Sequence, residues 1–152
     1  MALFLSNFTN KIDKKGRVSV PATFRLALSG QDFAGIVVYE SFINQSIEGC
    51  DMNRIRQLSE SIDNLDPFSE VRDSFATTIL GSAVQLAFDQ DGRVILPERL
   101  LTLADIKDQA VFVGKGSTFE IWQPQKFAEY AAKAREKAKE NRELLRLAKK
   151  ES

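Results

Sequence analysis

Apolar and polar residues alternate in two stretches of the chain that lie 76 positions apart. Residues 8–12 read Phe-Thr-Asn-Lys-Ile, and residues 84–88 read Val-Gln-Leu-Ala-Phe. Alternation with a period of two is typical of a strand that buries one face. Each stretch is followed by nearly the same nine residues, DKKGRVSVP at 13–21 and DQDGRVILP at 89–97. The repetition predicts one small β unit that occurs twice.

Each nine-residue repeat predicts a tight turn between two strands. The first strand ends at an Asp, the chain turns at a Gly that can adopt a positive φ, and a second strand begins at an Arg. Pro21 and Pro97 stop the strand pairing and can begin short helices at 22–28 and 98–103. Two further apolar strands complete each copy, and they are expected at 35–39, 46–48, 110–113 and 119–122.

A helical insert separates the two copies. Asp51 is a predicted N-cap, and the apolar residues that follow it recur at helical spacing. Asp66-Pro67 begins a second helix, which Gly81 ends. The apolar residues of the two predicted helices are Met52, Ile55, Leu58, Ile62, Leu65, Phe68, Val71, Phe75 and Ile79.

The residues after Pro124 predict a long exposed helix. Glu129 and Lys133 have i,i+4 spacing, and Glu136 and Lys139 have i,i+3 spacing, so both pairs can form ion pairs along a helix. A weak apolar side, typical of a packing surface, consists of Phe127, Tyr130, Ala134, Ala138, Leu145 and Ala148. The predicted organisation is a first half-unit at 1–50, the insert at 51–82, a second half-unit at 83–124 and a C-terminal helix at 125–152.

Composition narrows the possible functions. The chain has 152 residues, no histidine and a single cysteine, Cys50. Without histidine, the commonest general base and the commonest transition-metal ligand are both missing, so metalloenzyme and Ser-His or Cys-His schemes have almost no support. We expect no enzyme, no metal and no cofactor. One cysteine cannot form an internal disulfide and is compatible with a reducing cytoplasm. No apolar run reaches the length of a membrane span, so no membrane partner is expected.

Charge is distributed unevenly although the net charge is zero. Residues 1–25 carry five basic residues and one acid, for a net charge of +4. Residues 26–83 carry nine acids and three arginines, for a net charge of −6. Such an asymmetry can give one surface a basic field, although solvated lysines on an ordinary surface would have the same composition.

Three interpretations of the Asp-x-x-Gly-Arg turn compete. In the structural interpretation, the Asp caps a hairpin turn and the Arg pairs with it. In the catalytic interpretation, Asp13 or Asp89 is a general base, but the chain offers no nucleophile, phosphate-binding loop or partner carboxylate at a usable spacing. In the third interpretation, the turn binds nucleic acid.

The nucleic-acid interpretation uses the basic residues of the first turn. Lys14, Lys15 and Arg17 can neutralise phosphates, and Arg can read guanine in the major groove through two hydrogen bonds. The preceding Asp could hold the guanidinium extended before DNA binds. The turn has no aromatic residues for base stacking, which favours duplex DNA over single strands. The candidate DNA-binding residues are Lys11, Asp13, Lys14, Lys15, Arg17, Asp89 and Arg93.

The paired Asp-x-x-x-Arg motifs, each within D-x-x-G-R-V-x-apolar-P, resemble those of the MraZ family of bacterial transcriptional regulators, which belongs to the AbrB/SpoVT superfamily of swapped-hairpin DNA-binding domains. The resemblance covers nearly the whole chain. It implies an α+β fold in which two tandem half-units pair within one chain to form one small β-barrel. It further implies ring-shaped homo-oligomers that bind tandem promoter repeats of the division and cell-wall gene cluster, including the protein's own operon, in the cytoplasm at the nucleoid.

The two turns differ in charge. Gln90-Asp91 replaces Lys14-Lys15, and Ala87 replaces Lys11. We therefore expect the first turn to be the principal DNA surface and Arg93 to have a secondary or structural role. An alternative function is an antitoxin-like protein-interaction module that uses the same barrel, with the C-terminal helix as its recognition segment.

Overall fold

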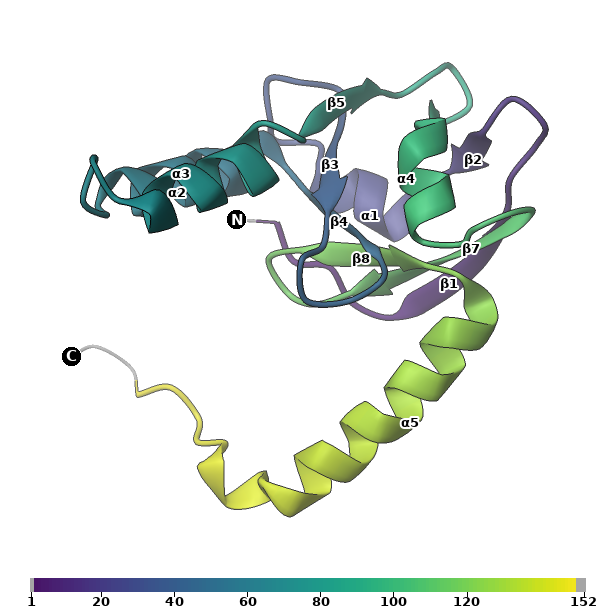
Figure 1. Ribbon diagram of the computed structural model, residues 1–152. Helices are drawn as coiled ribbons and strands as arrows, with labels where there is room; N and C mark the ends of the chain where they lie inside the picture. Colours follow the sequence, from purple (N-terminus) through teal and green to yellow (C-terminus); the bar gives the residue numbers. More distant parts are fainter. Residues whose placement is uncertain (1, 150–152) are drawn as a thin grey trace.

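The computed structural model of the protein describes residues 2–149 and has an α+β fold (Figure 1). Six strands form one antiparallel sheet in the order β1-β7-β8-β4-β3-β5, and β2 and β6 form a separate two-stranded ladder. The strands are β1 (Asn7–Lys11), β2 (Arg17–Ser19), β3 (Gly35–Glu40), β4 (Ile47–Cys50), β5 (Val84–Ala87), β6 (Arg93–Ile95), β7 (Gln109–Gly114) and β8 (Phe119–Trp122).

The two copies of the β unit are interleaved in these sheets. Strand β1 of the first copy pairs with β7 of the second, and β5 of the second copy pairs with β3 of the first. The two copies also meet between β2 and β6, where Val18 is opposite Val94, and between β4 and β8, where Glu48 is opposite Glu120. Exchanging the copies leaves the strand order unchanged, so the fold has an approximate two-fold axis through these two pairs.

The observed arrangement of two sheets differs from the single closed barrel that was expected. Within residues 2–149, no ladder closes the six-stranded sheet into a barrel, and an isolated bridge between Ile12 and Val18 links the end of β1 to the β2–β6 ladder. The two ladder strands have only three residues each, because a Gly turn precedes each strand and a Pro lies two residues beyond it. A proline cannot donate a ladder hydrogen bond, so the pairing cannot extend past it.

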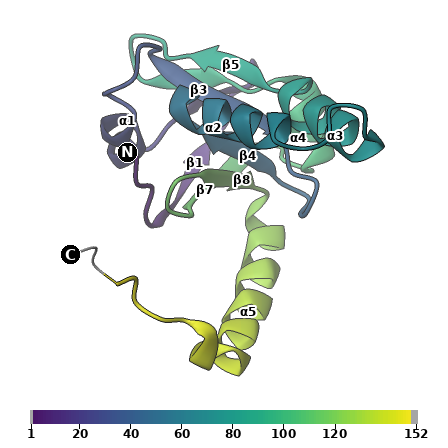
Figure 2. The ribbon, with the colours of Figure 1, turned by 90° about the vertical axis from the view of Figure 1, so that its left-hand side faces the viewer.

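Helices cover both faces of the sheet, as the two views in Figures 1 and 2 show. The short helices α1 and α4 pack on the face that holds the main core, while α2 and η1 lie over β3 and β4 on the other face. The helical segments are α1 (Ala22–Ala27), α2 (Met52–Asp63), α3 (Glu70–Phe75), the π-helical η1 (Ala76–Leu80), α4 (Glu98–Leu103), α5 (Pro124–Glu140) and the 3₁₀ turn η2 (Arg142–Leu144).

The main core is built around the aromatic ring of Phe24 in α1. Its ring centroid lies 5.2 Å from that of Phe4, 5.8 Å from that of Phe8 and 5.3 Å from that of Phe119. The first two contacts are edge-to-face, a geometry that aromatic quadrupoles favour. Val18 and Val94 also belong to this core, which therefore supports the β2–β6 ladder from beneath.

Several predicted element bounds are corrected by the structure. The second insert helix begins at Glu70 with Ser69 as its N-cap, rather than at Asp66-Pro67, because the Asp66 carboxylate accepts a hydrogen bond from the Phe68 amide and forms a separate turn. The closing strand expected at 46–48 extends to Cys50. Asp51 is the N-cap of α2, as predicted, and accepts a hydrogen bond from the Arg54 amide.

The C-terminal helix is shorter than the sequence predicted. It ends at Glu140, and the Asn141 side chain donates to the Lys137 carbonyl at 2.8 Å, which caps the last turn. Leu145 and Ala148, which were assigned to its apolar side, therefore lie beyond α5, and residues 150–152 of the predicted element lie outside the described residues. Among residues 2–149, no helix has both the length and the apolar character needed to cross a membrane.

Two carboxyl groups meet on the two-fold axis. Glu120 is buried and accepts from Trp122 Nε1 at 2.9 Å and from Lys115 Nζ at 3.0 Å. These contacts lower the pKa of Glu120 against the effect of its burial. Burial, followed by the hydrogen bond to Glu120, raises the pKa of Glu48 to about 8. One proton, held by Glu48, therefore allows both groups to stay in the interior.

We predict that Glu48→Gln makes stability less sensitive to pH. In the wild type, the unfolded chain loses the Glu48 proton near pH 4.5 and the native state near pH 8, so stability falls as the pH rises between these values. The variant should exceed the wild type in free energy of unfolding by about 1–3 kcal/mol at pH 9 and by much less at pH 5, because Glu48 is only partly buried. Urea titrations at both values measure this difference; an equal difference at the two pH values would contradict it.

Candidate nucleic-acid interface

The first repeated turn is held by the carboxylate of Asp13. Asp13 Oδ1 accepts from the backbone amides of Lys15 and Arg17, each at 2.9 Å, and Oδ2 accepts from Arg17 Nε at 2.6 Å. The chain reverses at Gly16, whose φ of 85° favours glycine, and the Gly16 amide donates to the Asp13 carbonyl at 3.0 Å. Asp13 thus caps the turn and fixes the guanidinium of Arg17 with a single side chain.

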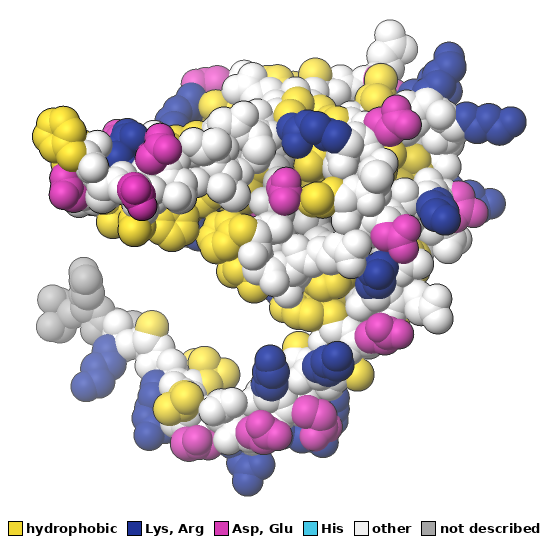
Figure 3. Space-filling view, viewed as in Figure 1, with side chains coloured by type: hydrophobic (Ala, Val, Ile, Leu, Met, Phe, Trp, Pro, Cys, Tyr) yellow, Lys and Arg dark blue, Asp and Glu magenta, His cyan; other side chains and the backbone are white. Residues whose placement is uncertain are grey.

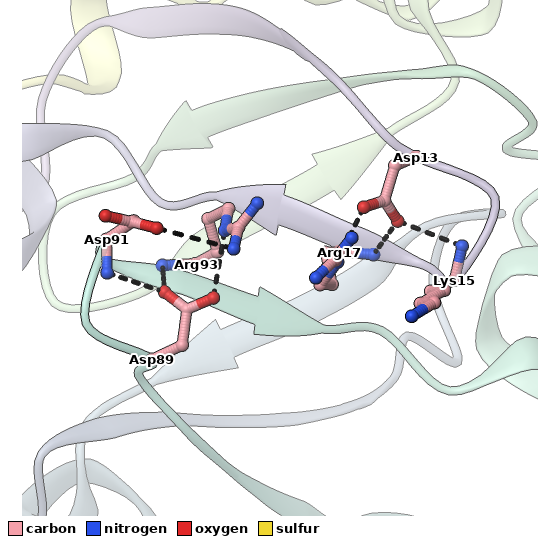
Figure 4. A network of polar contacts seen from close by, with 6 residues as sticks. All are labelled: Asp13, Lys15, Arg17, Asp89, Asp91 and Arg93. Carbon is pink, nitrogen blue, oxygen red and sulfur yellow. Dashed lines mark hydrogen bonds and ion pairs between the residues drawn. The ribbon is translucent and has the colours of Figure 1, made fainter.

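The second turn repeats this hydrogen-bonding pattern (Figure 4). Asp89 Oδ1 accepts from the amides of Asp91 at 2.8 Å and Arg93 at 2.9 Å, and Oδ2 accepts from Arg93 Nε at 2.9 Å. Gly92 has a φ of 74°. The structural interpretation of the motif, an Asp that caps the turn and pairs with the Arg, is therefore confirmed in both copies.

Both capping carboxylates are held in their ionised form. The backbone hydrogen bond from Arg17 is the largest cause of a lowered pKa at Asp13, and the one from Arg93 has the same effect at Asp89. Each Arg is consequently positioned by a negative charge throughout the neutral pH range, rather than by packing alone.

The β2–β6 ladder places both arginines on one outward face. Arg17 pairs with Ile95 and Ser19 pairs with Arg93, so these four residues share a face, while Val18 and Val94 turn into the core. Arg17 and Arg93 are diagonal neighbours, which in an antiparallel pair lie about 7–8 Å apart. Ile95 is 58 % exposed between them. The result is a two-stranded ribbon whose outer surface carries two Asp-paired arginines and one exposed apolar side chain.

The two arginines differ in the number of carboxylates that contact their guanidinium groups. The contacts of the Arg17 guanidinium within residues 2–149 use Nε, which leaves both Nη groups available. Arg93 Nη2 lies 3.4 Å from Asp91 Oδ2 in addition to the Nε contact with Asp89. Asp91 thus reduces the ability of Arg93 to bind another anion, which gives a geometric basis for the expected difference between the turns.

The predicted lysines surround the first turn. Lys14 and Lys15 are exposed at its tip, and Lys11 is exposed at the end of β1. Figure 3 shows basic side chains projecting from the end of the molecule that carries this turn. The structure thus brings six of the seven candidate residues to two neighbouring turns and places Lys11 on the strand that leads into the first of them.

Two exposed basic residues near the turns were missed by the sequence analysis. A Cβ added to Gly92 would lie 2.7 Å from Nε, Nη1 and Cζ of Arg25, so the Arg25 side chain packs directly on the second turn. Lys107 lines the same surface hollow as Asp13 and Lys14 beside the first turn. Both residues come from the opposite copy of the unit, so only the interleaved fold brings them to these turns.

The fold and the ribbon define a small α+β protein of duplicated β units whose two Asp-capped turns lie side by side. The chain belongs to the MraZ family. A family model described as "MraZ protein, putative antitoxin-like" matches residues 79–147, and relatives match nearly the full length.

Among these relatives, the transcriptional regulator MraZ of Rickettsia bellii strain OSU 85-389 is 54 % identical over 147 residues, which cover 96 % of this chain and 98 % of the relative. The protein of the same name from Pelagibacter ubique strain HTCC1062 is 53 % identical over 144 residues, which cover 95 % of this chain and 93 % of the relative. The protein from Rickettsia akari strain Hartford is 51 % identical over 146 residues, which cover 96 % and 98 %. The shared name supports a role in transcription regulation rather than in catalysis.

Proposed function

We propose that this protein is a sequence-specific transcriptional regulator that binds double-stranded DNA through its β2–β6 ribbon. The observation that carries the proposal is the placement of Arg17 and Arg93 on one outward face of a two-stranded antiparallel ribbon. The major groove of B-form DNA is wide enough to admit such a ribbon. Because each Arg is already held at Nε by an Asp, little side-chain entropy is lost when it meets a base.

Arg17, Ile95 and the cations around the ribbon have different roles in this proposal. The free Nη groups of Arg17 donate to O6 and N7 of a guanine, and the exposed Ile95 side chain contacts a thymine methyl group. The surrounding cations bind phosphates and fix the register of the ribbon without reading the sequence. These phosphate-binding residues are Lys11, Lys14, Lys15, Arg25 and Lys107.

The proposal extends to the assembly and to the target. The interleaved strand pairs support a swapped-hairpin arrangement of the two half-units within one chain. Homo-oligomers, with ring closure, would present several ribbons to tandem promoter repeats, and multivalent binding raises the apparent affinity without new contacts. The proposed targets are repeats upstream of the protein's own operon in the division and cell-wall gene cluster. This activity places the protein in the cytoplasm at the nucleoid.

A gel shift with the DNA upstream of the protein's own gene tests this function. The upstream duplex should be retarded at protein concentrations at which a shuffled duplex of equal length and composition is not. Retardation of both duplexes at the same concentration would leave only non-specific binding and would contradict the proposal.

The antitoxin-like interaction module is a second candidate, since the description of the matching family model includes those words. A protein partner would be recognised by contacts that depend weakly on salt. Phosphate contacts release counterions, so DNA affinity must fall steeply as salt increases. Loss of DNA affinity between low and moderate salt would favour the ribbon as a DNA surface over a protein-binding surface.

We predict that Arg25→Gln weakens DNA binding although Arg25 lies outside the repeated motif. Its guanidinium packs on the second turn, where it supplies a cation that Gln90-Asp91 lacks. Loss of one phosphate contact should reduce the slope of log affinity against log salt by about one unit. Arg56→Gln, which removes an exposed cation on α2 in the insert, is the matched control and should leave the slope unchanged. Equal slopes for Arg25→Gln and the wild type would assign Arg25 a purely structural role.

A further inference from the structure

Two apolar surfaces of the chain remain uncovered. The first, here called the insert patch, lies on the outer part of the helical insert and on the loop between β3 and β4. Phe68 is 96 % exposed and Ile43 is 77 % exposed. The rings of Phe42 and Phe75 lie 5.9 Å apart, which makes the loop and α3 one continuous surface. The insert patch comprises Phe42, Ile43, Phe68, Val71 and Phe75.

The second surface belongs to a projecting arm, residues 132–149. The base of α5 is fixed to the body, because the ring of Tyr130 stacks on Trp122 at 4.6 Å and Phe127 packs beside it. From residue 132 to residue 149 every side chain is exposed. Leu147 is 97 % exposed, and Leu144 and Leu145 beside it are also exposed. Within residues 2–149, the arm therefore buries no side chain against the body.

Figure 3 shows hydrophobic side chains along the insert and the body, on the side that faces the hollow above the arm. Contiguous exposed apolar surface is typical of a site that contacts another protein. The insert patch and the arm both have this character, and they are held apart in the single chain.

The charges of the two regions are complementary. The insert at 51–82 carries six acids and three arginines, a net charge of −3. The arm carries seven basic residues and three acids, a net charge of +4. Glu70 and Asp73 lie on α3 next to the patch, whereas Arg142 and Arg146 flank the arm leucines. Opposite charges around apolar contacts favour one orientation of approach and disfavour contact between two arms or two patches.

We propose that the arm of one copy docks on the insert patch of a second copy. This inference rests on the proposed homo-oligomer and assigns its interface. Leu144, Leu145 and Leu147 of one chain cover the exposed phenylalanines of the next, and the flanking arginines face the acids of α3. Since each chain has one arm and one patch, the contact is head-to-tail and can close into a ring.

Two double variants test the interface at residues whose side chains are exposed. The arm variant is Leu145→Ser with Leu147→Ser, and the patch variant is Phe68→Ser with Val71→Ser. Each should reduce the mass measured by sedimentation at micromolar concentration from that of the wild-type oligomer to that of one 17.1 kDa chain. The control Leu26→Ser, at an equally apolar residue that is 75 % exposed on α1, should keep the wild-type mass.

An equimolar mixture of the arm and patch variants separates docking between copies from docking within one chain. The arm variant retains an intact patch and the patch variant retains an intact arm, so the mixture should form a complex of two chains that grows no further. Circular dichroism of each variant confirms that it is folded. If both variants keep the wild-type mass, or if the mixture stays monomeric, the docking proposal is overturned.

The outcomes also separate this inference from the proposed function. A monomeric wild type would overturn the homo-oligomer and the docking together, whereas an oligomer that neither variant affects would overturn the docking alone. Affinity for a duplex with a single repeat is expected to be unchanged in both variants, because the ribbon and the arm share no residues. Loss of that affinity in the folded variants would contradict the separation of the two surfaces.

Discussion

Arg17→Ala is expected to abolish most specific DNA binding while leaving the fold intact. Its guanidinium is held by Asp13 on the outward face of the ribbon, with both Nη groups available for a guanine. Loss of a bidentate base contact costs about 1–3 kcal/mol, which is roughly a 5- to 150-fold loss in affinity for one site. Fluorescence anisotropy with one-repeat and multi-repeat duplexes should show the larger loss on the multi-repeat duplex, because an oligomer loses the contact at every site.

Arg93→Ala is the matched control for this prediction. Arg93 has the same place in the second turn, but Asp91 also engages its Nη2 at 3.4 Å. Its substitution should therefore cost less affinity than that of Arg17 at equal salt. Equal losses would mean that the turns are functionally equivalent. An Arg17→Ala variant with a lower thermal stability but unchanged affinity per folded molecule would reduce the motif to a structural turn.

Replacing the sequence of the first turn by that of the second is expected to weaken DNA binding and to make it less sensitive to salt. Lys14→Gln with Lys15→Asp copies the second turn onto the first and removes two exposed cations. The slope of log affinity against log salt should become shallower by about two units, and affinity should fall by a similar factor on specific and shuffled DNA. Anisotropy titrations across a salt series measure both quantities.

The reverse exchange provides an internal check. Gln90→Lys with Asp91→Lys adds two cations to the second turn and releases Arg93 from Asp91. The affinity for DNA should increase, and the slope of log affinity against log salt should become steeper. If neither exchange changes the slope, the turns do not face phosphates.

Local signals in the sequence predicted the repeated elements well. The Asp, the Gly and the Pro of each motif define the turn, the positive φ and the end of the ladder through interactions within nine residues. The structure shows the same turn hydrogen bonds in both copies. The turn could be placed from the sequence because an Asp followed by a Gly favours this local hydrogen bonding and the repeat shows the combination twice.

Features that depend on distant pairing could not be predicted in this way. Arg25 reaches the second turn, and Lys107 the first, only because the strands of the two copies alternate in space. The carboxyl groups of Glu48 and Glu120 likewise meet only because β4 pairs with β8, although the two residues are 72 positions apart in the sequence. Helix ends were missed where a side chain competes with the helix, as the Asp66 carboxylate does before α3 and the Asn141 amide does after α5.

The function that we propose for the β2–β6 ribbon is binding of duplex DNA with sequence preference. The decisive measurement is the affinity of the wild-type protein for the upstream duplex and for its shuffled counterpart, obtained by fluorescence anisotropy across one salt series. We expect log affinity to fall steeply with log salt concentration, with the same slope for both duplexes and about one unit of slope for each phosphate contact. The upstream duplex should be bound more tightly at every salt concentration. Equal affinity for the two duplexes, or an affinity that does not change with salt, would contradict this function.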